Sequence, residues 1–579
     1  MTVSLQSSAF LEAIEKHEPS SIAVVENDTG GSFSYNSLLH RITRAKELLL
    51  LKTGNSDRHF RRADCFHVTL LAILASNAIA VPLAPSCPVP ELRYILDNSE
   101  ALVLISSSKF TAKASEVLDD GLTKPPLYYQ FDGTWPAPTD DKEVTLYDFS
   151  DELSGGMMLF TSGTTARPKG VVLSLANLTA QASSLLEAWQ YAPSDRLLHV
   201  LPLHHNHGTV NALLTPLLAG SSIEFMYPFN VSSVWTRLAA PFLQTPGMNG
   251  IHKAAGDAKY VTQMHIAFFT AVPTIWSRLL RTYELLSPEM QKPCRQAISP
   301  GYLRPGISGS AALPKPIRDG WAELSGGNLL LERYGMTEVG MALSCGLEEV
   351  DRVDGCVGWP FPSVEARLME TDDDTGSQVV ISLGVETDLD SGRERVREIQ
   401  LRGPTVFKGY WRNDEATAKE FTTDEWFKTG DIAVRCRVPG SGLGKSGSWA
   451  QGPAYFIRGR RSVDIIKTGG EKVEECAVVG LASEAWDHKV AAVIALSENS
   501  PSESEPISLR YLRDSLKSRL TAYKIPQDME IVDMLPRNAM GEVNKKELIA
   551  SVFGGIEGIR RRSFSLGKGR VSSAATTTT

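Results

Sequence analysis

Strand-like apolar runs alternate with helix-like segments along most of this chain, and this alternation limits the folds that it can adopt. Among the first 150 residues, helix-like patterns at 38–51 and 70–77 precede a short buried strand at 101–105. A second series of strands and helices alternates at 197–201, 209–218, 267–269, 274–285 and 329–331. The pattern predicts an α/β fold whose layers contain a largely parallel sheet.

The chain has 579 residues, too many for one hydrophobic core, so two or more domains are expected. Short strands with Gly and Pro turns at 355–434 predict a β-rich subdomain, followed by a Gly/Ser-rich loop or hairpin insertion at 440–452. We predict a large N-terminal domain at 1–458, a small mobile α+β domain at 459–555 and a disordered tail at 556–579.

Composition narrows the functional class. The 42% hydrophobic and 22% charged residues are typical of a soluble protein, and the net charge of −8 argues against a general nucleic-acid binder. The seven cysteines form no Cys-x-x-Cys pair, so neither a zinc site nor a disulfide framework is indicated. The N-terminus lacks a signal-peptide core, and the apolar run at 68–84 is interrupted by Ser76, Asn77 and Pro82. We therefore expect a cytoplasmic protein with no membrane partner.

A loop rich in hydroxyls and glycine follows the apolar run 157–160. Backbone N–H groups, hydroxyls and a lysine in such a loop suit a polyphosphate. The common Gly-x-x-x-x-Gly-Lys phosphate loop is absent, and a plain Ser/Thr/Gly turn is the alternative interpretation. The candidate nucleotide-binding residues are Thr161, Ser162, Gly163, Thr164, Thr165 and Lys169.

Two more motifs carry polar groups suited to a nucleotide. Tyr334, Thr337 and Glu338 follow the apolar run 329–331, where α/β sheets bind ligands. Tyr334 offers a π-face, Thr337 a donor and Glu338 a hard oxygen ligand for Mg²⁺, although a helix capping box would explain the same pattern. Asp431, in a Thr-Gly-Asp triplet, has two acceptor oxygens that suit a vicinal diol, although the triplet alone is a common turn.

In this order, the motifs resemble those of the adenylate-forming superfamily, which includes acyl-CoA synthetases, luciferases and peptide-synthetase adenylation domains. The resemblance spans roughly residues 10–550. It implies that ATP and a carboxylic acid form an acyl-AMP, which most members pass to a thiol such as that of CoA. It also implies that Tyr334 stacks on adenine, Thr337 contacts the α-phosphate, Glu338 holds Mg²⁺, and Asp431 binds the ribose hydroxyls. Arg460, in a hinge-like motif at 459–470 with Ser462 at the pivot, would also contact the ribose.

The acid pocket looks closest to that of malonyl-CoA synthetases. His205, in the motif 202–208, falls at the position that gates the carboxylate, and Met336 is assigned to the same pocket. The resemblance implies that Arg278 and Ser310 bind a distal carboxylate, which needs a charge-assisted partner when buried. The alternative is that Arg278 is a solvated helix residue like Arg281.

The chain departs from the family pattern at several positions. Ala166 replaces a usual glycine, and the family expects Lys where this chain has Glu542. Because that lysine bridges the acid and the phosphate, charge reversal would cost at least the roughly 2.7–4 kcal/mol of one lost donor. Only six residues, 471–476, occupy an interval where the family has a strand and a helix. A similar compression affects 51–66, and either one can be a true deletion or a faulty gene model.

Three functions follow from these observations. The first is an ATP-dependent acid–CoA ligase that uses Mg²⁺ and favours malonate or another short dicarboxylate, with catalytic roles for Lys169, His205, Thr337 and Glu338. The second is a catalytically impaired homologue that binds nucleotide or a partner, as Glu542 suggests. The third is delivery to a carrier protein or pathway enzyme, although no carrier domain is visible in the chain.

Overall fold

The computed structural model describes part of the chain and divides it into two compact units, Met1–Gly459 and Arg460–Thr579. The described residues are 3–6, 8–26, 31–53, 60–61, 66–132, 144–147, 155–161, 168–243, 264–371, 378–383, 397–460, 476–483, 487–495, 508–516, 525–532, 535, 543 and 545–553. The predicted tail at 556–579 lies outside them.

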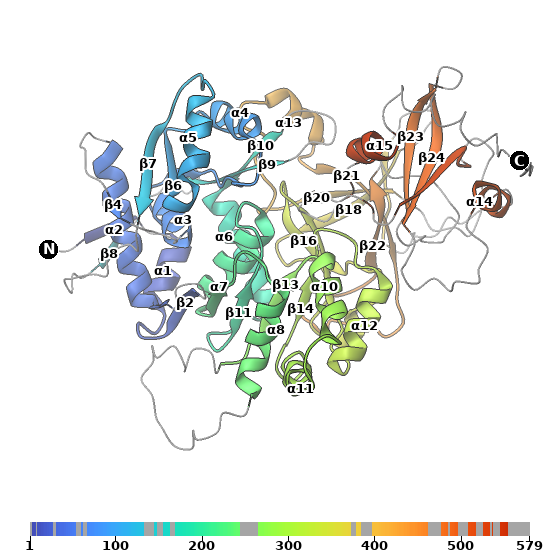
Figure 1. Ribbon diagram of the computed structural model, residues 1–579, viewed down its shortest axis with the longest axis horizontal. Coiled ribbons are helices and arrows are strands. Elements are labelled where there is room, and N and C mark those ends of the chain that lie inside the picture. Colours follow the sequence, from blue (N-terminus) through green and yellow to red (C-terminus); the bar gives the residue numbers. More distant parts are fainter. Residues whose placement is uncertain are drawn as a thin grey trace, which may run out of the picture. The chain divides into compact units, whose positions relative to one another are not determined.

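A nine-stranded sheet forms the centre of the first unit (Figure 1). Its order is β17 (Trp359–Pro360), β16 (Gly340–Ser344), β15 (Leu331–Met336), β14 (Gly306–Ser308), β13 (Phe268–Ala271), β11 (Arg196–His199), β12 (Ser222–Phe225), β2 (Ile22–Glu26) and β3 (Gly31–Ser34). The six strands from β15 to β2 pair in parallel, whereas β16, β17 and β3 are antiparallel. This arrangement confirms the predicted α/β fold.

Helices cover both faces of this sheet because consecutive strand residues point to opposite sides. Leu197 and Phe268 join one core cluster, and their neighbours Leu198 and Phe269 join another. The elements around the first cluster include α1 (Ala9–Lys16), α2 (Tyr35–Thr53), α3 (Phe66–Ala75), α6 (Leu175–Trp189) and α7 (Thr215–Ala219). Those around the second are α8 (Val231–Ala239), α10 (Pro273–Tyr283), α11 (Pro288–Ala297) and α12 (Lys315–Ser325).

Three smaller sheets complete the N-terminal part. They are β1 (Val3–Gln6) with β8 (Val144–Tyr147); β4 (Phe60–Arg61), β7 (Leu127–Asp132) and β6 (Val103–Ser107); and β10 (Lys169–Ser174), β9 (Gly156–Thr161) and β5 (Ile79–Ala80). The remaining helices here are α4 (Val89–Ser99) and α5 (Thr111–Asp119). The antiparallel pair β9–β10 flanks the predicted phosphate loop.

The predicted helix at 209–218 is wrong in its form. The chain instead makes a π-helix, His207–Leu214, followed by the short helix α7. Pro216 explains the break, because it has no N–H to donate to a carbonyl of the preceding turn. All eight residues of the π-helix are buried, and such helices are often found at functional sites.

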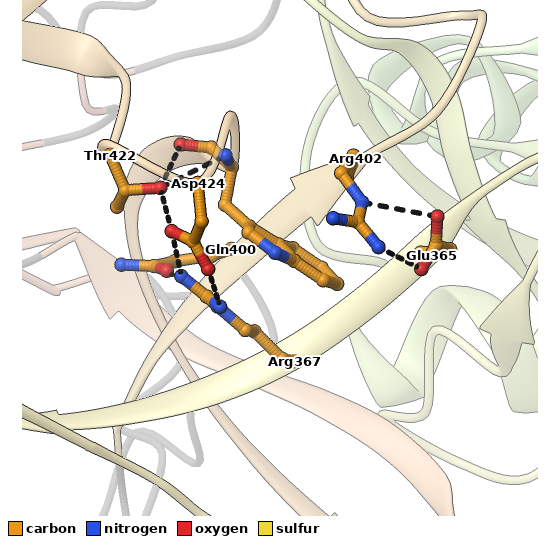
Figure 2. A network of polar contacts seen from close by, with 7 residues as sticks. Glu365, Arg367, Gln400, Arg402, Thr422 and Asp424 are labelled. Atoms are coloured by element: carbon orange, nitrogen blue, oxygen red, sulfur yellow. Dashed lines mark hydrogen bonds and ion pairs between the residues drawn. The ribbon is translucent and has the colours of Figure 1, made fainter.

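The β-rich subdomain predicted at 355–434 contains most of a five-stranded sheet. The strands are β19 (Gln378–Val380), β18 (Glu365–Thr371), β20 (Arg397–Arg402), β21 (Phe427–Cys436) and β22 (Ala454–Arg460), with helix α13 (Asp414–Glu420) between β20 and β21. Figure 2 shows Arg367 of β18 paired with Asp424, and Arg402 of β20 paired with Glu365. Both guanidinium groups also lie over the Trp426 ring, 4.4 and 4.6 Å from its centroid. These contacts fasten the sheet to the turn before β21.

The second unit is a small α+β body. Its strands are β23 (Cys476–Ser483), β24 (Asp487–Ala495) and β25 (Asp528–Val532), and its helices are α14 (Leu509–Leu516) and α15 (Lys545–Phe553). Leu548 of α15 packs with Ala477 and Val479 of β23 in a separate core. A large α/β unit and a small α+β unit therefore bear out the predicted fold class. Among the helices of the described residues, none is long and apolar enough to cross a membrane.

Candidate active site

Loops at the carboxyl ends of neighbouring parallel strands bring the polar residues of the site together. His205 and His207 follow β11, Thr270 lies near the end of β13, and Ser310 follows β14. Arg333 lies within β15, the next strand. Parallel α/β sheets bind their ligands at this edge.

His207 is at the centre of this group. Its Nε2 atom lies 2.5 Å from Thr270 Oγ1, and its Nδ1 atom lies 3.5 Å from Ser310 Oγ. Burial, followed by the charge of Arg333, holds the pKa of His207 well below its usual value. The imidazole is therefore neutral at pH 7. Ser310 is presented from a backbone with φ of +69°, a conformation that non-glycine residues seldom adopt.

Arg333 is a buried cation with neutral neighbours. It is 6% exposed, and its Nη2 atom donates to Ser310 Oγ at 3.3 Å. Its Nε atom has no hydrogen-bond partner among the described residues, and none of their carboxylates pairs with the guanidinium. Burial lowers its pKa to about 10, so it remains charged at pH 7. A buried charge without a counter-charge is costly, and an anionic ligand would relieve that cost.

Two other predicted acid-pocket residues are partly accessible. His205 is half-buried, and burial, with a smaller contribution from His204, lowers its pKa to about 3. Met336 is half-buried at the end of β15. Both are able to contact a ligand while remaining uncharged at pH 7.

Arg278 lies on the exposed surface of α10 and pairs with no acidic residue of the described chain. Its carbonyl accepts a hydrogen bond from Thr282. The structure records no contact between Arg278 and Ser310, whose side chain meets Arg333 and His207 instead. The role of Arg278 at a distal carboxylate stays a prediction.

The predicted nucleotide residues of β15 and β21 meet although they are 97 positions apart. The Tyr334 hydroxyl donates to Asp431 Oδ2 at 2.5 Å. Asp431 is buried and its N–H donates to Thr429 Oγ1, whereas Tyr334 and Thr337 are half-buried. The contact brings an aromatic ring and a carboxylate together, and their roles at adenine and ribose stay predictions.

Glu338 and Lys169 both contact Tyr410. The Tyr410 hydroxyl donates to Glu338 Oε1 at 3.0 Å, and Lys169 Nζ lies 4.0 Å from the centre of the Tyr410 ring. Lys169 Nζ is also 3.7 Å from Glu420 Oε1. Opposite charges thus lie close together beside the predicted phosphate loop.

The surroundings of Glu338 fit Mg²⁺ that is bound together with phosphates. Among the described residues, no group of three or more His, Cys, Asp or Glu could hold a metal ion. Mg²⁺ usually takes one or two carboxylates and completes its shell with phosphate oxygens and water, so one carboxylate is sufficient. Glu338 is 9% exposed, and Phe407 N–H fixes its backbone carbonyl at 2.8 Å.

Several predicted residues remain to be placed. Ser162, Gly163, Thr164 and Thr165 lie outside the described residues, as does Glu542. Thr161 ends β9 and is half-buried, with its hydroxyl 3.5 Å from the Lys169 carbonyl. Arg460 ends β22. Their roles in nucleotide binding stay predictions.

Sequence reasoning missed four residues that the structure places at the site. Arg333 directly precedes Tyr334, and His207 is part of the 202–208 motif, so the motifs themselves are a signal for both residues. Thr270 and Tyr410 carry no such signal, because their partners are distant in the sequence.

Known proteins resemble this chain over nearly its whole length. The model of the AMP-binding enzyme family matches residues 10–411, and that of the AMP-binding enzyme C-terminal domain matches 468–542. A CoA ligase of Gibberella moniliformis is 67% identical over 98% of both chains. Human malonate–CoA ligase ACSF3, a mitochondrial protein, is 36% identical over 82% of this chain and 79% of its own. The crystal structure of ATP-bound MatB from Rhodopseudomonas palustris matches with a TM-score of 0.70 at 26% identity, covering 94% of this chain and 98% of that one.

Proposed function

The chain belongs to the AMP-binding enzyme family, and we propose that it is an ATP-dependent acid–CoA ligase whose acid is malonate or another short dicarboxylate. The observation that carries the choice of acid is Arg333, a buried guanidinium with no carboxylate partner among the described residues. Relatives named as malonate–CoA ligases support the same choice. A fatty acid would leave this cation unpaired in an apolar tunnel.

The acid is held at both ends. Arg333 and Ser310 bind the distal carboxylate through charge-assisted hydrogen bonds, and neutral His207 adds a donor or acceptor beside them. The reacting carboxylate lies toward His205, whose low pKa leaves the imidazole uncharged at pH 7. Arg278 remains a second candidate for the distal end.

In the first half-reaction an oxygen of the acid attacks the α-phosphorus of ATP, forming an acyl-AMP and releasing pyrophosphate. Lys169 and the loop 161–165 bind the phosphates, Thr337 contacts the α-phosphate, and Glu338 holds Mg²⁺ beside them. When bound, Mg²⁺ neutralises phosphate charge. Tyr334 stacks on the adenine and Asp431 binds the ribose hydroxyls.

In the second half-reaction the sulfur of CoA attacks the acyl carbon and the thiol proton passes to solvent. The bond between the acyl carbon and the phosphate oxygen breaks, and AMP leaves. We propose that the domain at 459–555 moves between the two steps, with Arg460 contacting the ribose. Domain closure of this kind lets one site serve two reactions.

The test is pyrophosphate release by the purified protein with ATP, Mg²⁺ and CoA, across acetate, malonate, methylmalonate, oxalate and a medium-chain fatty acid. Release with malonate, accompanied by malonyl-CoA, supports the proposal. Release only with the fatty acid overturns the choice of acid. Absence of release with every acid, together with binding of ATP, points to the impaired homologue.

The acceptor and the cellular location are proposed on weaker grounds. CoA is the proposed acceptor, and replacing it in the assay by a phosphopantetheine-bearing carrier protein tests the alternative. The cytosol is the proposed location because the five cysteines whose side chains are described are free thiols, as in a reducing compartment. Cell fractionation tests the location, since human ACSF3 is named as mitochondrial.

A further inference from the structure

A small cavity lies behind the loop that carries His205 and His207. Its volume is about 10 Å³, the size that admits one water molecule. Its walls come from β10, α6, the start of the π-helix, the first residue of β16 and the segment before Phe407. The cavity is thus next to the acid and nucleotide residues but separate from the polar group around Arg333.

Three residues of the cavity wall carry a buried oxygen atom that has no partner among the described residues. The atoms are Gln181 Oε1, Asn206 Oδ1 and Thr405 Oγ1. The three side chains are 3%, 9% and 2% exposed, so bulk water does not satisfy them. Buried polar atoms are nearly always hydrogen-bonded, and three unpaired ones around one cavity indicate a shared ligand.

The orientation of Gln181 follows from its other contact. Its Nε2 atom donates to the Met341 carbonyl at 3.0 Å, so its oxygen must be the atom without a partner. A Cβ added to Gly340, another residue of the cavity wall, would lie 1.7 Å from that oxygen. The glycine therefore allows Gln181 Oε1 to reach the cavity.

We propose that the cavity holds one water molecule that donates to Gln181 Oε1 and Asn206 Oδ1 and accepts from the Thr405 hydroxyl. Three partners match the usual coordination of buried water. A hard cation is a poorer match, because it takes six or more oxygen ligands and the wall offers three unpaired ones.

The water joins the segments that form the active site. Asn206 lies between His205 and His207, and Gly340 is two residues beyond Glu338. Thr405 is two residues before Phe407, whose N–H donates to the Glu338 carbonyl. Asn177 already fixes α6 to the carbonyls of Pro404 and Val406, at 2.7 and 3.0 Å. Gln181, Asn206 and Thr405 are therefore positioning residues for acid and metal binding, a consequence that rests on the proposed function.

A high-resolution crystal structure tests the water directly, with or without activity. The expected result is one density peak about 2.7–3.2 Å from all three oxygens, which disappears in Thr405→Val. No peak in the wild type overturns the proposal. A peak with at least six oxygen ligands at about 2.3–2.6 Å also overturns it, because that is a cation.

A double-mutant cycle tests whether the side chains share the water. Thr405→Val and Asn206→Leu keep the side-chain shapes, and each should raise the KM for the acid about fivefold or more. The double variant should be no worse than the poorer single variant by more than about twofold, because the water is already lost. If the increases in KM of the two single variants multiply in the double variant, the proposal of a shared water is overturned.

Thr43→Val is the matched control. The Thr43 hydroxyl is buried but donates to Leu39 O within its own helix, away from the cavity. Combined with Asn206→Leu, it should show independent effects. The same double-mutant cycle can be measured with the midpoint of thermal unfolding in place of the KM. This measurement needs no substrate, so it tests the shared water even if the proposed acid is wrong.

Discussion

At the scale of single residues, two arginines are candidates for the distal carboxylate. Arg333 is buried beside Ser310, and Arg278 is exposed on α10. We expect Arg333→Met to lower kcat/KM for malonate by about 30-fold or more, because truncating one partner of a buried charge pair costs about 2–5 kcal/mol. The measurement is kcat/KM for malonate and for acetate in each variant.

Arg278→Met is the matched control, with the same change of side chain at an exposed position. If Arg333 holds the carboxylate, this variant keeps the wild-type preference for malonate over acetate. A loss of malonate preference in Arg278→Met alone would instead assign the carboxylate to Arg278, as the motif resemblance predicted.

Tyr410 is expected to set the position of the Mg²⁺ ligand. Tyr410→Phe removes the hydroxyl that donates to Glu338 but keeps the ring beneath Lys169. Because hydrogen bonds to charged groups contribute about 1.5–3 kcal/mol, the Mg²⁺ concentration for half-maximal pyrophosphate release should rise at least tenfold. Calorimetry should give the same trend for ATP binding with and without Mg²⁺.

Tyr94→Phe is the control for this effect. Tyr94 also donates from its hydroxyl near the phosphate loop, but to the Pro168 carbonyl at 3.0 Å. An equal loss of Mg²⁺ affinity in both variants would contradict a specific role for Tyr410.

The residue-level predictions depended on what a local motif is able to reveal. Tyr334, Thr337 and Glu338 form one short motif, so their chemistry was readable in sequence. Tyr410 was not, because its contacts to Lys169 and Glu338 depend on the tertiary fold. Family resemblance points to Arg278, but a resemblance does not report burial. Arg333 is buried whereas Arg278 is exposed.

At the scale of elements, the loop after β14 approaches β15 so closely that it leaves no room for a side chain. A Cβ on Gly309 would lie 2.3 Å from Arg333 Nε. Gly309→Ala should therefore displace the guanidinium and raise the KM for malonate about tenfold or more, through loss of a charge-assisted contact. The KM for ATP should change less than about twofold.

Gly301→Ala is the control, because a Cβ there would meet no atom within 4 Å. If Gly309→Ala raised both KM values equally, the glycine would serve the fold of the whole site and not the placement of Arg333.

Sequence pattern predicts where helices and strands lie better than it predicts which type of helix forms. The strand predicted at 197–201 is β11, which is a short, continuously buried run, and the helix predicted at 38–51 is α2, which keeps a buried face. Sequence pattern predicts an ordinary helix where the π-helix lies, because all its residues are buried and no polar face reveals the period. The cavity next to it depends on the same tertiary packing and has no signature in the sequence.

At the scale of the whole molecule, buried histidines should make the protein sensitive to acid. Burial, reinforced by Arg41 and His199, lowers the pKa of His67 to about 3 from its usual value of 6.5. Below pH 6.5 the unfolded chain therefore takes up a proton that the folded chain does not. The free energy of unfolding should fall by about 1.4 kcal/mol per pH unit from this group, or about 2 kcal/mol between pH 6.5 and 5.

His67→Phe should remove this part of the decline while keeping the stack on Phe225. Urea unfolding at pH 7 and at pH 5 measures the loss of unfolding free energy between these two pH values. The variant should lose less stability than the wild type over this interval, whereas replacing the exposed His265 by Phe should leave the decline unchanged. Equal declines in wild type and His67→Phe would mean that His67 is not the group responsible.

The two half-reactions use different residues of the chain. A substitution at Glu542 should therefore change the rate of adenylation without changing the rate of thioester formation. The family expects a lysine there to stabilise charge during adenylation, whereas thioester formation starts after pyrophosphate has left. Glu542→Lys should therefore raise the rate of pyrophosphate release by about 100-fold or more. Thioester formation from supplied acyl-AMP and CoA should change by less than about threefold.

Glu547→Lys makes the same charge change five positions away on α15 and should alter neither rate. If Glu542→Lys left pyrophosphate release unchanged, adenylation would not depend on this position, and Lys545 would be the next residue to replace.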